Sequence, residues 1–185
     1  MLLYIIYMLL YLLLIYFTTV NSLNFYNIKT IKKFYNYNNL NYDIYNDITS
    51  NKLTAEHIFP KYYTKMYTNC KYDMHNIFLT NSITNSYRSN YKFSNESFIN
   101  NLLYDSSKNY KNHKYKIFIP SYKSRGIISR SIKYMLYNYD KLLLENIIDE
   151  YTLNYWDDKY PPTQFEYKKN RLIKYLQGNY NIFIN

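Results

Sequence analysis

The first 17 residues, MLLYIIYMLLYLLLIYF, carry no charged side chain and almost no polar one apart from tyrosine. A run of this length lies at the short limit for a membrane-spanning helix and at the long limit for the apolar part of a signal peptide. No basic segment precedes it, but the small polar residues that follow, TTVNS, suit a cleavage site. We expect residues 1–22 to be a cleaved signal peptide, with a retained membrane anchor and a buried core helix as the alternatives.

Between residues 54 and 91 the pattern predicts a strand, a loop, a second strand and a helix. Residues 56–59 read as a strand, because Pro60 pushes the preceding residue towards extended backbone and then ends the run. Residues 74–79 alternate poorly but are apolar and suited to a strand, and residues 81–88 suit a short helix. This order is that of a ββα unit.

The flanking segments are predicted as loops and helices. Residues 23–53 suit one short helix followed by loop, and residues 92–116 read as a polar loop that leads to a short apolar run ending at Pro120. Apolar side chains at helical spacing then predict three helices, over about residues 127–139, between residues 142 and 151, and over residues 166–176. The predicted fold class is α+β, with the ββα motif embedded in a mostly helical single domain over residues 23–185.

The formal net charge of +10 favours a polyanionic partner, either nucleic acid or an acidic membrane face. The alternative is that the excess charge only keeps the protein soluble. Tyrosine, with 28 copies, and asparagine recur in every segment, so a single Tyr or Asn carries little information.

Glycine and cysteine are scarce. The two glycines, Gly126 and Gly178, are expected where the backbone needs a positive φ or a close approach, and Gly178 also follows the last predicted helix. The single cysteine, Cys70, cannot form a disulfide within the chain, and we expect a free, partly buried thiol.

An acidic residue beside a histidine, Glu56-His57, lies in the first predicted strand. Hydrolysis of a phosphodiester needs a base, an offset for charge on the leaving oxygen, and a grip on the phosphate. His57 can be the base, because an ordinary imidazole is neutral at pH 7. Glu56 and Asn85 can offer oxygen ligands to Mg²⁺, with Mn²⁺ or Ca²⁺ as substitutes. Arg88, one turn after Asn85, can bind a phosphate.

Taken singly, these residues are weak signals. A Glu-His pair is more often a solvated surface pair, and neighbours in a regular strand point to opposite faces, so the pair can serve one site only at a strand end or bulge. His75 is more often a satisfied, partly buried histidine, and His113 is more often plain surface.

Together the motifs resemble the endonuclease I family of ββα-metal (His-Me finger) nucleases. The residues that carry the resemblance are EHIFP from Glu56, DMHNI from Asp73 and NSYRSNY from Asn85. Two later stretches agree: PSYKSRGIISRSIKYM from Pro120, and a tail with Trp156, Tyr160-Pro161 and Gln177-Gly178-Asn179. The resemblance covers about residues 54–185.

The resemblance implies His57 as general base, Glu56 and Asn85 as Mg²⁺ ligands, and Arg130 as a phosphate-facing arginine. Arg88 is the second candidate for the phosphate, and Arg125 is a further substrate-binding candidate. Three residues match the second strand of the family, where we expect supporting hydrogen bonds rather than catalysis: Asp73, His75 and Asn76. Core packing is expected for Trp156 and a structural role for Gln177-Gly178-Asn179.

The family resemblance also implies a secreted or periplasmic, sequence-non-specific endonuclease that leaves 5′-phosphates on DNA, with RNA left open as a second substrate. We expect a monomer that meets a membrane only through residues 1–20, if these are retained. Ala55, Ser129 and Ile182 depart from the family pattern, but none of them is assigned to catalysis. The alternative is a non-catalytic, basic nucleic-acid-binding protein at a membrane that retains the fold.

Overall fold

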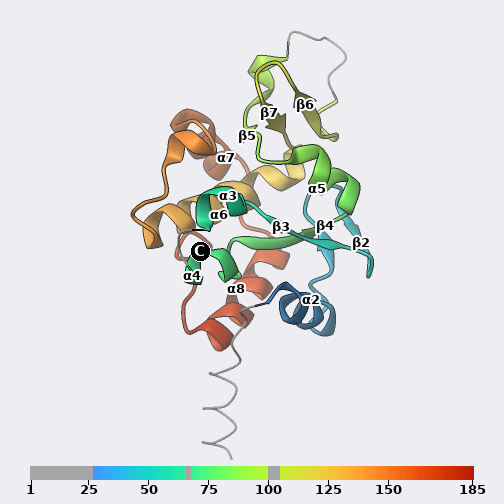
Figure 1. Ribbon diagram of the computed structural model, residues 1–185, viewed down its shortest axis with the longest axis vertical. Helices are drawn as coiled ribbons and strands as arrows, with labels where there is room; N and C mark the ends of the chain where they lie inside the picture. The colour runs from blue at the N-terminus through green and yellow to red at the C-terminus, as the bar shows by residue number, and fades with distance from the viewer. Residues whose placement is uncertain (1–26, 66–67, 100–104) are drawn as a thin grey trace, which may run out of the picture.

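A computed structural model of the protein describes residues 27–65, 68–99 and 105–185. In these ranges the chain forms seven α-helices and seven short strands, which confirms the predicted α+β class (Figure 1). The α-helices are α2 (Ile28–Tyr37), α3 (Lys61–Thr64), α4 (Thr68–Tyr72), α5 (Ser82–Arg88), α6 (Tyr122–Asn138), α7 (Glu150–Lys159) and α8 (Gln164–Gln177). The strands are β1 (Tyr42–Asp43), β2 (Ile48–Thr49), β3 (Thr54–His57), β4 (Ile77–Thr80), β5 (Lys92–Phe93), β6 (Tyr110–Asn112) and β7 (Ile117–Ile119). Two 3₁₀ turns, η1 (Glu96–Phe98) and η2 (Leu144–Asn146), complete the described elements.

The first sheet has the strand order β2-β1-β4-β3, in which β3 and β4 are antiparallel and place Glu56 opposite Phe78. All four residues of β4 are buried, because one apolar cluster packs on each of its faces. Phe78 joins the larger cluster around α6 and α7, while Ile77 and Leu79 join the smaller cluster with α2 and α8. Burial on both faces explains why this strand does not alternate in the sequence.

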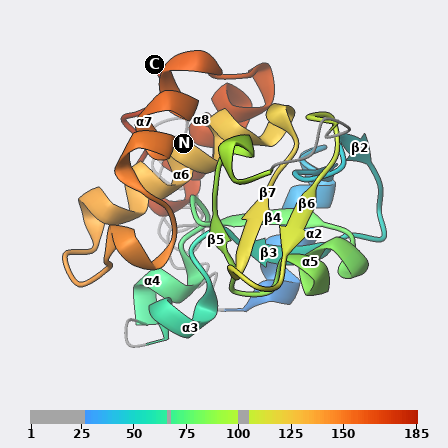
Figure 2. The same cartoon turned by 90° about the horizontal axis from the view of Figure 1, so that it is seen from above.

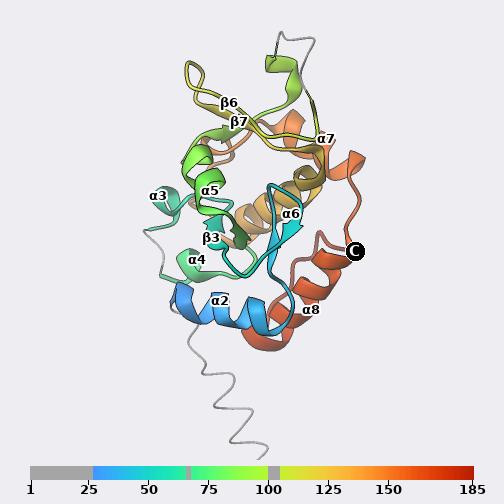
Figure 3. The same ribbon diagram turned by 90° about the vertical axis from the view of Figure 1, so that its right-hand side faces the viewer.

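The second sheet, with the order β5-β7-β6, lies at the opposite end of the molecule from α2 and α8, and α6 passes between (Figure 3). Helices α6 and α7 pack side by side, and α3 and α4 lie together at one edge of the fold (Figure 2). Trp156 of α7 is fully buried in the larger cluster, as predicted. Cys70 is also buried, and burial raises the pKa of its thiol to about 12.

The predicted ββα order is confirmed, but the bounds of both strands differ from the prediction. The first strand runs over Thr54–His57 rather than residues 56–59, and the second over Ile77–Thr80 rather than residues 74–79. The segment before Ile77 forms a turn instead, because the Asp73 side chain accepts a hydrogen bond from the His75 backbone N–H at 2.8 Å. The helix predicted over residues 81–88 is α5, and Asn81 caps it by accepting from Thr84 N at 2.7 Å.

The predicted helix between residues 142 and 151 is wrong. Its apolar side chains Leu142, Ile147 and Ile148 are buried from the loop residues on either side of the turn η2. Helix α7 begins only at Glu150, where the Asp149 side chain accepts a hydrogen bond from Thr152 N. The helix predicted from residue 127 begins five residues earlier, at Tyr122. Short strands also replace parts of the loops predicted over residues 23–53 and 92–116.

The apolar run at residues 1–17, and with it the predicted signal peptide or anchor over residues 1–22, lies outside the described residues. Within the described ranges, no helix combines the length and the apolar character that a membrane span requires.

Candidate active site

Strand β3 and helix α5 lie against each other and carry four of the predicted site residues: Glu56, His57, Asn85 and Arg88. Thr54 and Glu56, which alternate along β3, both contact α5: Asn85 Nδ2 donates to Thr54 Oγ1 at 3.3 Å, and Arg88 Nη1 donates to Glu56 Oε1 at 3.2 Å. The one-turn spacing of Asn85 and Arg88 therefore matches the two-residue spacing of their partners on β3.

Glu56 is a buried carboxylate, with 3% of the residue exposed. Its Oε1 accepts hydrogen bonds from the Tyr45 hydroxyl at 2.7 Å and from Arg88. Burial raises the pKa of the Glu56 carboxyl above its ordinary value, and the Arg88 guanidinium limits the increase. Because Tyr45 and Arg88 both use Oε1, neither of them occupies Oε2.

His57 is the last residue of β3, so the Glu-His pair lies at a strand end. Its Nε2 is 3.0 Å from the carbonyl oxygen of Lys71 in α4. A carbonyl can only accept, so Nε2 carries the proton and the lone pair of the neutral ring is on Nδ1. Burial, reinforced by the charge of Lys61, lowers the pKa of His57 to about 4. The ring is therefore a neutral base at pH 7, on the α4 side of β3.

Asn85 contacts the strand through its amide nitrogen, which donates to Ala55 O at 3.0 Å as well as to Thr54. Because the nitrogen is held in this way, Oδ1 is the atom of Asn85 that could coordinate a cation. Asn85 therefore contacts the first two residues of β3, Thr54 and Ala55, while Glu56 and His57 are its last two. Asn85 and Arg88, one turn apart on α5, both lie against this strand.

Arg88 is 1% exposed and binds the end of β3 with both terminal nitrogens. Nη1 donates to His57 O at 3.1 Å in addition to Glu56, and Nη2 donates to Ile58 O at 2.7 Å. Its guanidinium carbon lies 4.6 Å from the centre of the Phe93 ring. A role in phosphate binding would require Arg88 to leave these partners, so its burial counts against that prediction.

Asn76 and Asp73 support the strand end from the side of β4. The Asn76 amide accepts from Phe59 N at 2.7 Å and donates to Phe59 O at 3.0 Å, which holds the chain just after His57. Asp73 accepts hydrogen bonds from Tyr134 at 3.0 Å, from Tyr139 at 2.8 Å and from Gln177 at 3.1 Å. Asn76 thus contacts the chain next to His57, while Asp73 connects this segment to α6 and α8, and their role in supporting the site stays a prediction.

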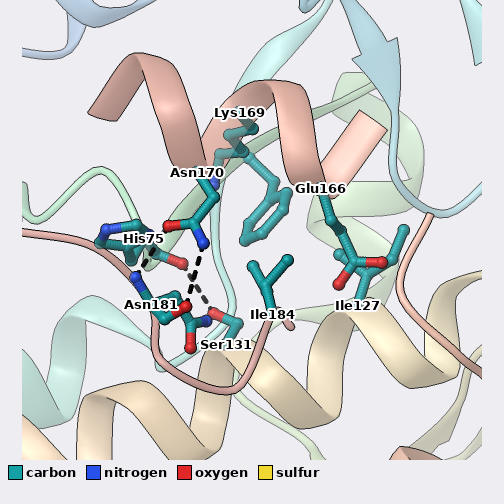
Figure 4. Close-up of a pocket in the computed structure, with 9 residues that line it drawn as sticks. His75, Ile127, Ser131, Glu166, Lys169, Asn170, Asn181 and Ile184 are labelled. Carbon is teal, nitrogen blue, oxygen red and sulfur yellow. Dashed lines mark hydrogen bonds between the residues drawn. The ribbon is translucent and has the colours of Figure 1, made fainter. Parts of the chain in front are cut away.

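His75 lines a small cavity between β4, α6, α8 and the C-terminal segment (Figure 4). The cavity has a volume of about 10 Å³, at the lower limit for one water molecule, and so cannot admit a substrate. The Nε2 atom of His75 is buried and has no hydrogen-bond partner among the described residues, which differs from the predicted satisfied histidine. Burial lowers the pKa of His75 to about 4. His113, by contrast, is exposed as predicted.

Comparison with known proteins decides the family. The family described as Endonuclease I matches residues 14–185, which include every motif described above. The chain belongs to the endonuclease I family.

Two curated proteins illustrate the relationship. The chain is 31% identical over 122 residues to Endonuclease-1 of Buchnera aphidicola subsp. Acyrthosiphon pisum (strain APS), which covers 65% of this chain and 47% of that protein. It is 32% identical over 112 residues to the Periplasmic deoxyribonuclease of Aeromonas hydrophila, which covers 60% of this chain and 46% of the relative. The chain spans about half the length of the curated relatives it matches.

In this endonuclease I family member, the two later arginines are tied to acidic partners. Arg130 binds both carboxylate oxygens of Glu166, at 2.7 and 3.0 Å, and also Asp157 Oδ1 at 3.2 Å. Arg125 Nη1 donates to Glu96 Oε2 at 2.6 Å, and its guanidinium lies 5.7 Å from the centre of the Trp156 ring. Arg130 lines a second pocket, of about 340 Å³, which is separate from the cavity beside His75; Lys123 and Tyr160 also line it. Contact of Arg125 and Arg130 with substrate stays a prediction. Each guanidinium would have to leave its carboxylate partner to bind a phosphate.

The oxygen donors of the site suit a hard cation. In the part of the chain that the structure describes, no group of three or more His, Cys, Asp and Glu side chains could hold a metal ion. Glu56 and Asn85 would supply one carboxylate and one amide oxygen, a set that matches Mg²⁺, which keeps several waters. It does not match a structural zinc site, which needs four protein ligands.

Sequence reasoning missed Tyr45, Asp43 and the Lys71 carbonyl. The Asp43 side chain is fully buried and accepts from Thr80 Oγ1 at 2.7 Å and from Asn81 N at 3.0 Å, so it joins β1 to the start of α5. No signal in the sequence could single out Tyr45 among 28 tyrosines. A backbone carbonyl such as that of Lys71 leaves no signal in the sequence at all.

Proposed function

We propose that this protein is a metal-dependent, sequence-non-specific endonuclease that hydrolyses nucleic-acid phosphodiesters and leaves 5′-phosphate ends. The observation that carries the proposal is the hydrogen bond from His57 Nε2 to the Lys71 carbonyl, beside the buried Glu56. This bond leaves Nδ1 of His57 unprotonated and fixes the ring in the orientation of a base.

His57 Nδ1 takes a proton from a water molecule as that water attacks phosphorus, and the bond to the 3′ oxygen breaks. Glu56 and Asn85 would hold Mg²⁺, which when bound would supply Lewis-acid stabilisation of the charge on the leaving oxygen. Arg88 and Tyr45 hold the Glu56 side chain in place through its Oε1. Mn²⁺ or Ca²⁺ could replace Mg²⁺ at the same oxygen ligands.

Lysines beside His57 are the basic groups that we assign to the substrate phosphates. Lys61 is the exposed first residue of α3. Lys71 is half-buried in α4, and its backbone carbonyl contacts the His57 ring. Their positive charge acts on His57 in the direction that lowers its pKa. The arginines chosen from the sequence are buried in ion pairs, so the lysines are the cations with the freer side chains.

The names of the relatives support the substrate and the location. One relative is named a deoxyribonuclease and periplasmic, which favours DNA over RNA and a place of action outside the cytosol. A cleaved signal peptide over residues 1–22 would deliver the domain there.

The test is cleavage of plasmid DNA by the full-length protein with Mg²⁺, with EDTA, and by the variant His57→Ala. We expect cleavage with Mg²⁺ and its loss in EDTA and in His57→Ala. The matched control, His113→Ala, changes an exposed histidine and should cleave like the wild type. Cleavage that persists in EDTA or in His57→Ala contradicts the mechanism, and DNA binding without any cleavage favours the non-catalytic alternative.

A further inference from the structure

A groove on the outer side of α5 opens next to the candidate active site. It has a volume of about 330 Å³ and is lined by α5 and by the segment that leads into β6. Its lining residues are Tyr45, Asn46, Ile83, Thr84, Tyr87, Ser107, Lys108 and Asn109. The buried Tyr45 also donates its hydroxyl to Glu56, so the groove and the candidate site share a side chain.

Tyr87 gives the groove a fixed aromatic surface. The residue is 42% exposed, yet the ring packs edge-on against Phe118 with 6.2 Å between the ring centres. Lys111 Nζ lies 5.1 Å from the centre of the same ring and 4.3 Å from that of Tyr91, which joins the β6 strand to the end of α5. An exposed ring that is held in place from the core side is suited to stacking with a nucleobase.

The rim of the groove is basic. Lys108 has 79% of its side chain exposed and lies 3.6 Å from the exposed carboxylate of Asp105. From residue 106 to residue 139 the sequence contains no Asp or Glu, while Lys108, Lys111, Lys114 and Lys116 follow one another along the β6–β7 hairpin. A basic rim beside an exposed aromatic ring fits a nucleic-acid strand better than it fits an apolar ligand.

The amide side chains in the groove are already engaged. Asn46 Nδ2 donates to Asp43 Oδ2 at 2.9 Å and to Thr84 Oγ1 at 3.1 Å. Asn109 donates to Tyr45 O and accepts from Ser121 N, both at 3.1 Å. The Asn46 amide nitrogen and both polar groups of the Asn109 amide could read a base edge only by giving up these partners, so the groove favours contact through the face of a base.

We propose that this groove is a nucleotide subsite, which takes one unpaired base of the substrate strand on the Tyr87 ring and the adjoining phosphates on Lys108 and Lys111. The inference rests on the proposed function and adds the preferred form of the substrate, which is a strand with an unpaired base rather than an intact duplex. In a duplex each base is stacked between its neighbours and cannot enter a groove beside a protein helix.

The test is binding of the full-length protein to a labelled single-stranded oligonucleotide and to its duplex, by fluorescence anisotropy in EDTA. We expect tighter binding to the single strand, a loss of about tenfold for that strand in Tyr87→Ala, and little change for the duplex. Tyr87→Phe keeps the ring and its contact with Phe118 and should bind like the wild type. The matched control is Tyr37→Ala, which removes a tyrosine that is 89% exposed on α2 and does not line the groove.

Equal losses for both ligands in Tyr87→Ala, or no loss for the single strand, overturn the subsite. Because binding is measured without catalysis, failure of the proposed function is recognised separately, as absence of plasmid cleavage by a wild-type protein that still shows the Tyr87-dependent preference.

Discussion

Three arginines that the sequence suggested as substrate ligands are buried and each connects separate elements. Arg88 joins α5 to β3, Arg125 joins α6 to η1, and Arg130 joins α6 to α8. Removing one partner of a buried ion pair leaves the other charge without compensation, which costs far more free energy than breaking a surface pair. At the scale of single residues, these arginines therefore hold separate elements together, and Arg88 is the one of the three that contacts Glu56 and His57.

The substitution Arg88→Ala is expected to lower the free energy of unfolding by about 3–5 kcal/mol, because the Glu56 carboxylate would remain buried without its counter-charge. Urea denaturation measures the change. Arg171→Ala, at an exposed position of α8, is the control and should stay within about 0.5 kcal/mol of the wild type. Similar losses in both variants would show that Arg88 does not compensate Glu56.

His75 should make the fold less stable in acid. It lies between the Asp73 carboxylate, which raises its pKa, and the Lys169 ammonium, which lowers it, and burial outweighs both and brings the pKa to about 4. The unfolded chain takes up this proton below about pH 6.5 and the folded chain only below about pH 4, so stability is lost as pH falls through that interval.

The contribution of His75 to this loss is up to about 3 kcal/mol. Urea denaturation at pH 7 and at pH 4.5 should show a smaller decrease in the free energy of unfolding for His75→Gln than for the wild type. His113→Gln, at an exposed position, serves as the control. An unchanged decrease in His75→Gln would mean that the ring is protonated in the folded state.

At the scale of elements, the two glycines meet the two needs expected of them. Gly178 has a φ of 82° and ends α8 in the left-handed region. Gly126 lies inside α6, where the Tyr160 carbonyl at the end of α7 comes so close that no side-chain carbon fits between them.

The substitution Gly126→Ala is expected to push α6 away from the end of α7 and to weaken the hydrogen bond from Arg130 to Tyr160 O. We expect a loss of stability of about 1–3 kcal/mol or more, because the obstructing atom belongs to the backbone. Gly178→Ala has free space around the new carbon and should lose only about 1 kcal/mol, from backbone strain. Thermal unfolding compares the two variants, and a larger effect at Gly178 would contradict the packing argument.

Apolar spacing located α6 and α8 but missed α7 and failed where a loop is buried. Leu142, Ile147 and Ile148 have the spacing of a helix face, yet they fill the core from an irregular segment. Periodicity reports that side chains are buried and does not report the backbone that buries them. The Asp149 cap, which does mark the start of α7, is a local signal that the sequence contained.

At the scale of the whole molecule, the net charge of +10 predicts strong salt dependence of nucleic-acid binding. Each phosphate contact contributes a slope of about −0.9 for duplex DNA in a plot of log affinity against log salt. Lys61→Ala should therefore reduce the slope by about one, measured by anisotropy in EDTA over a salt series. Lys33→Ala removes the same charge from an exposed position on α2 and should leave the slope unchanged. An identical slope in Lys61→Ala would remove this lysine from the phosphate contacts.

The amino-acid sequence by itself determined the family motifs, the ββα order, the cap at Asn81 and the stop at Gly178, because each of these depends on residues close together in the chain. Only the tertiary structure decided that Tyr45 and Arg88 hold Glu56, that Arg130 pairs with Glu166, and that the Lys71 carbonyl sets the tautomer of His57. These partners are 11 to 36 residues apart in the sequence. Burial and charge compensation between such distant groups arise when the chain packs, and no local pattern encodes them.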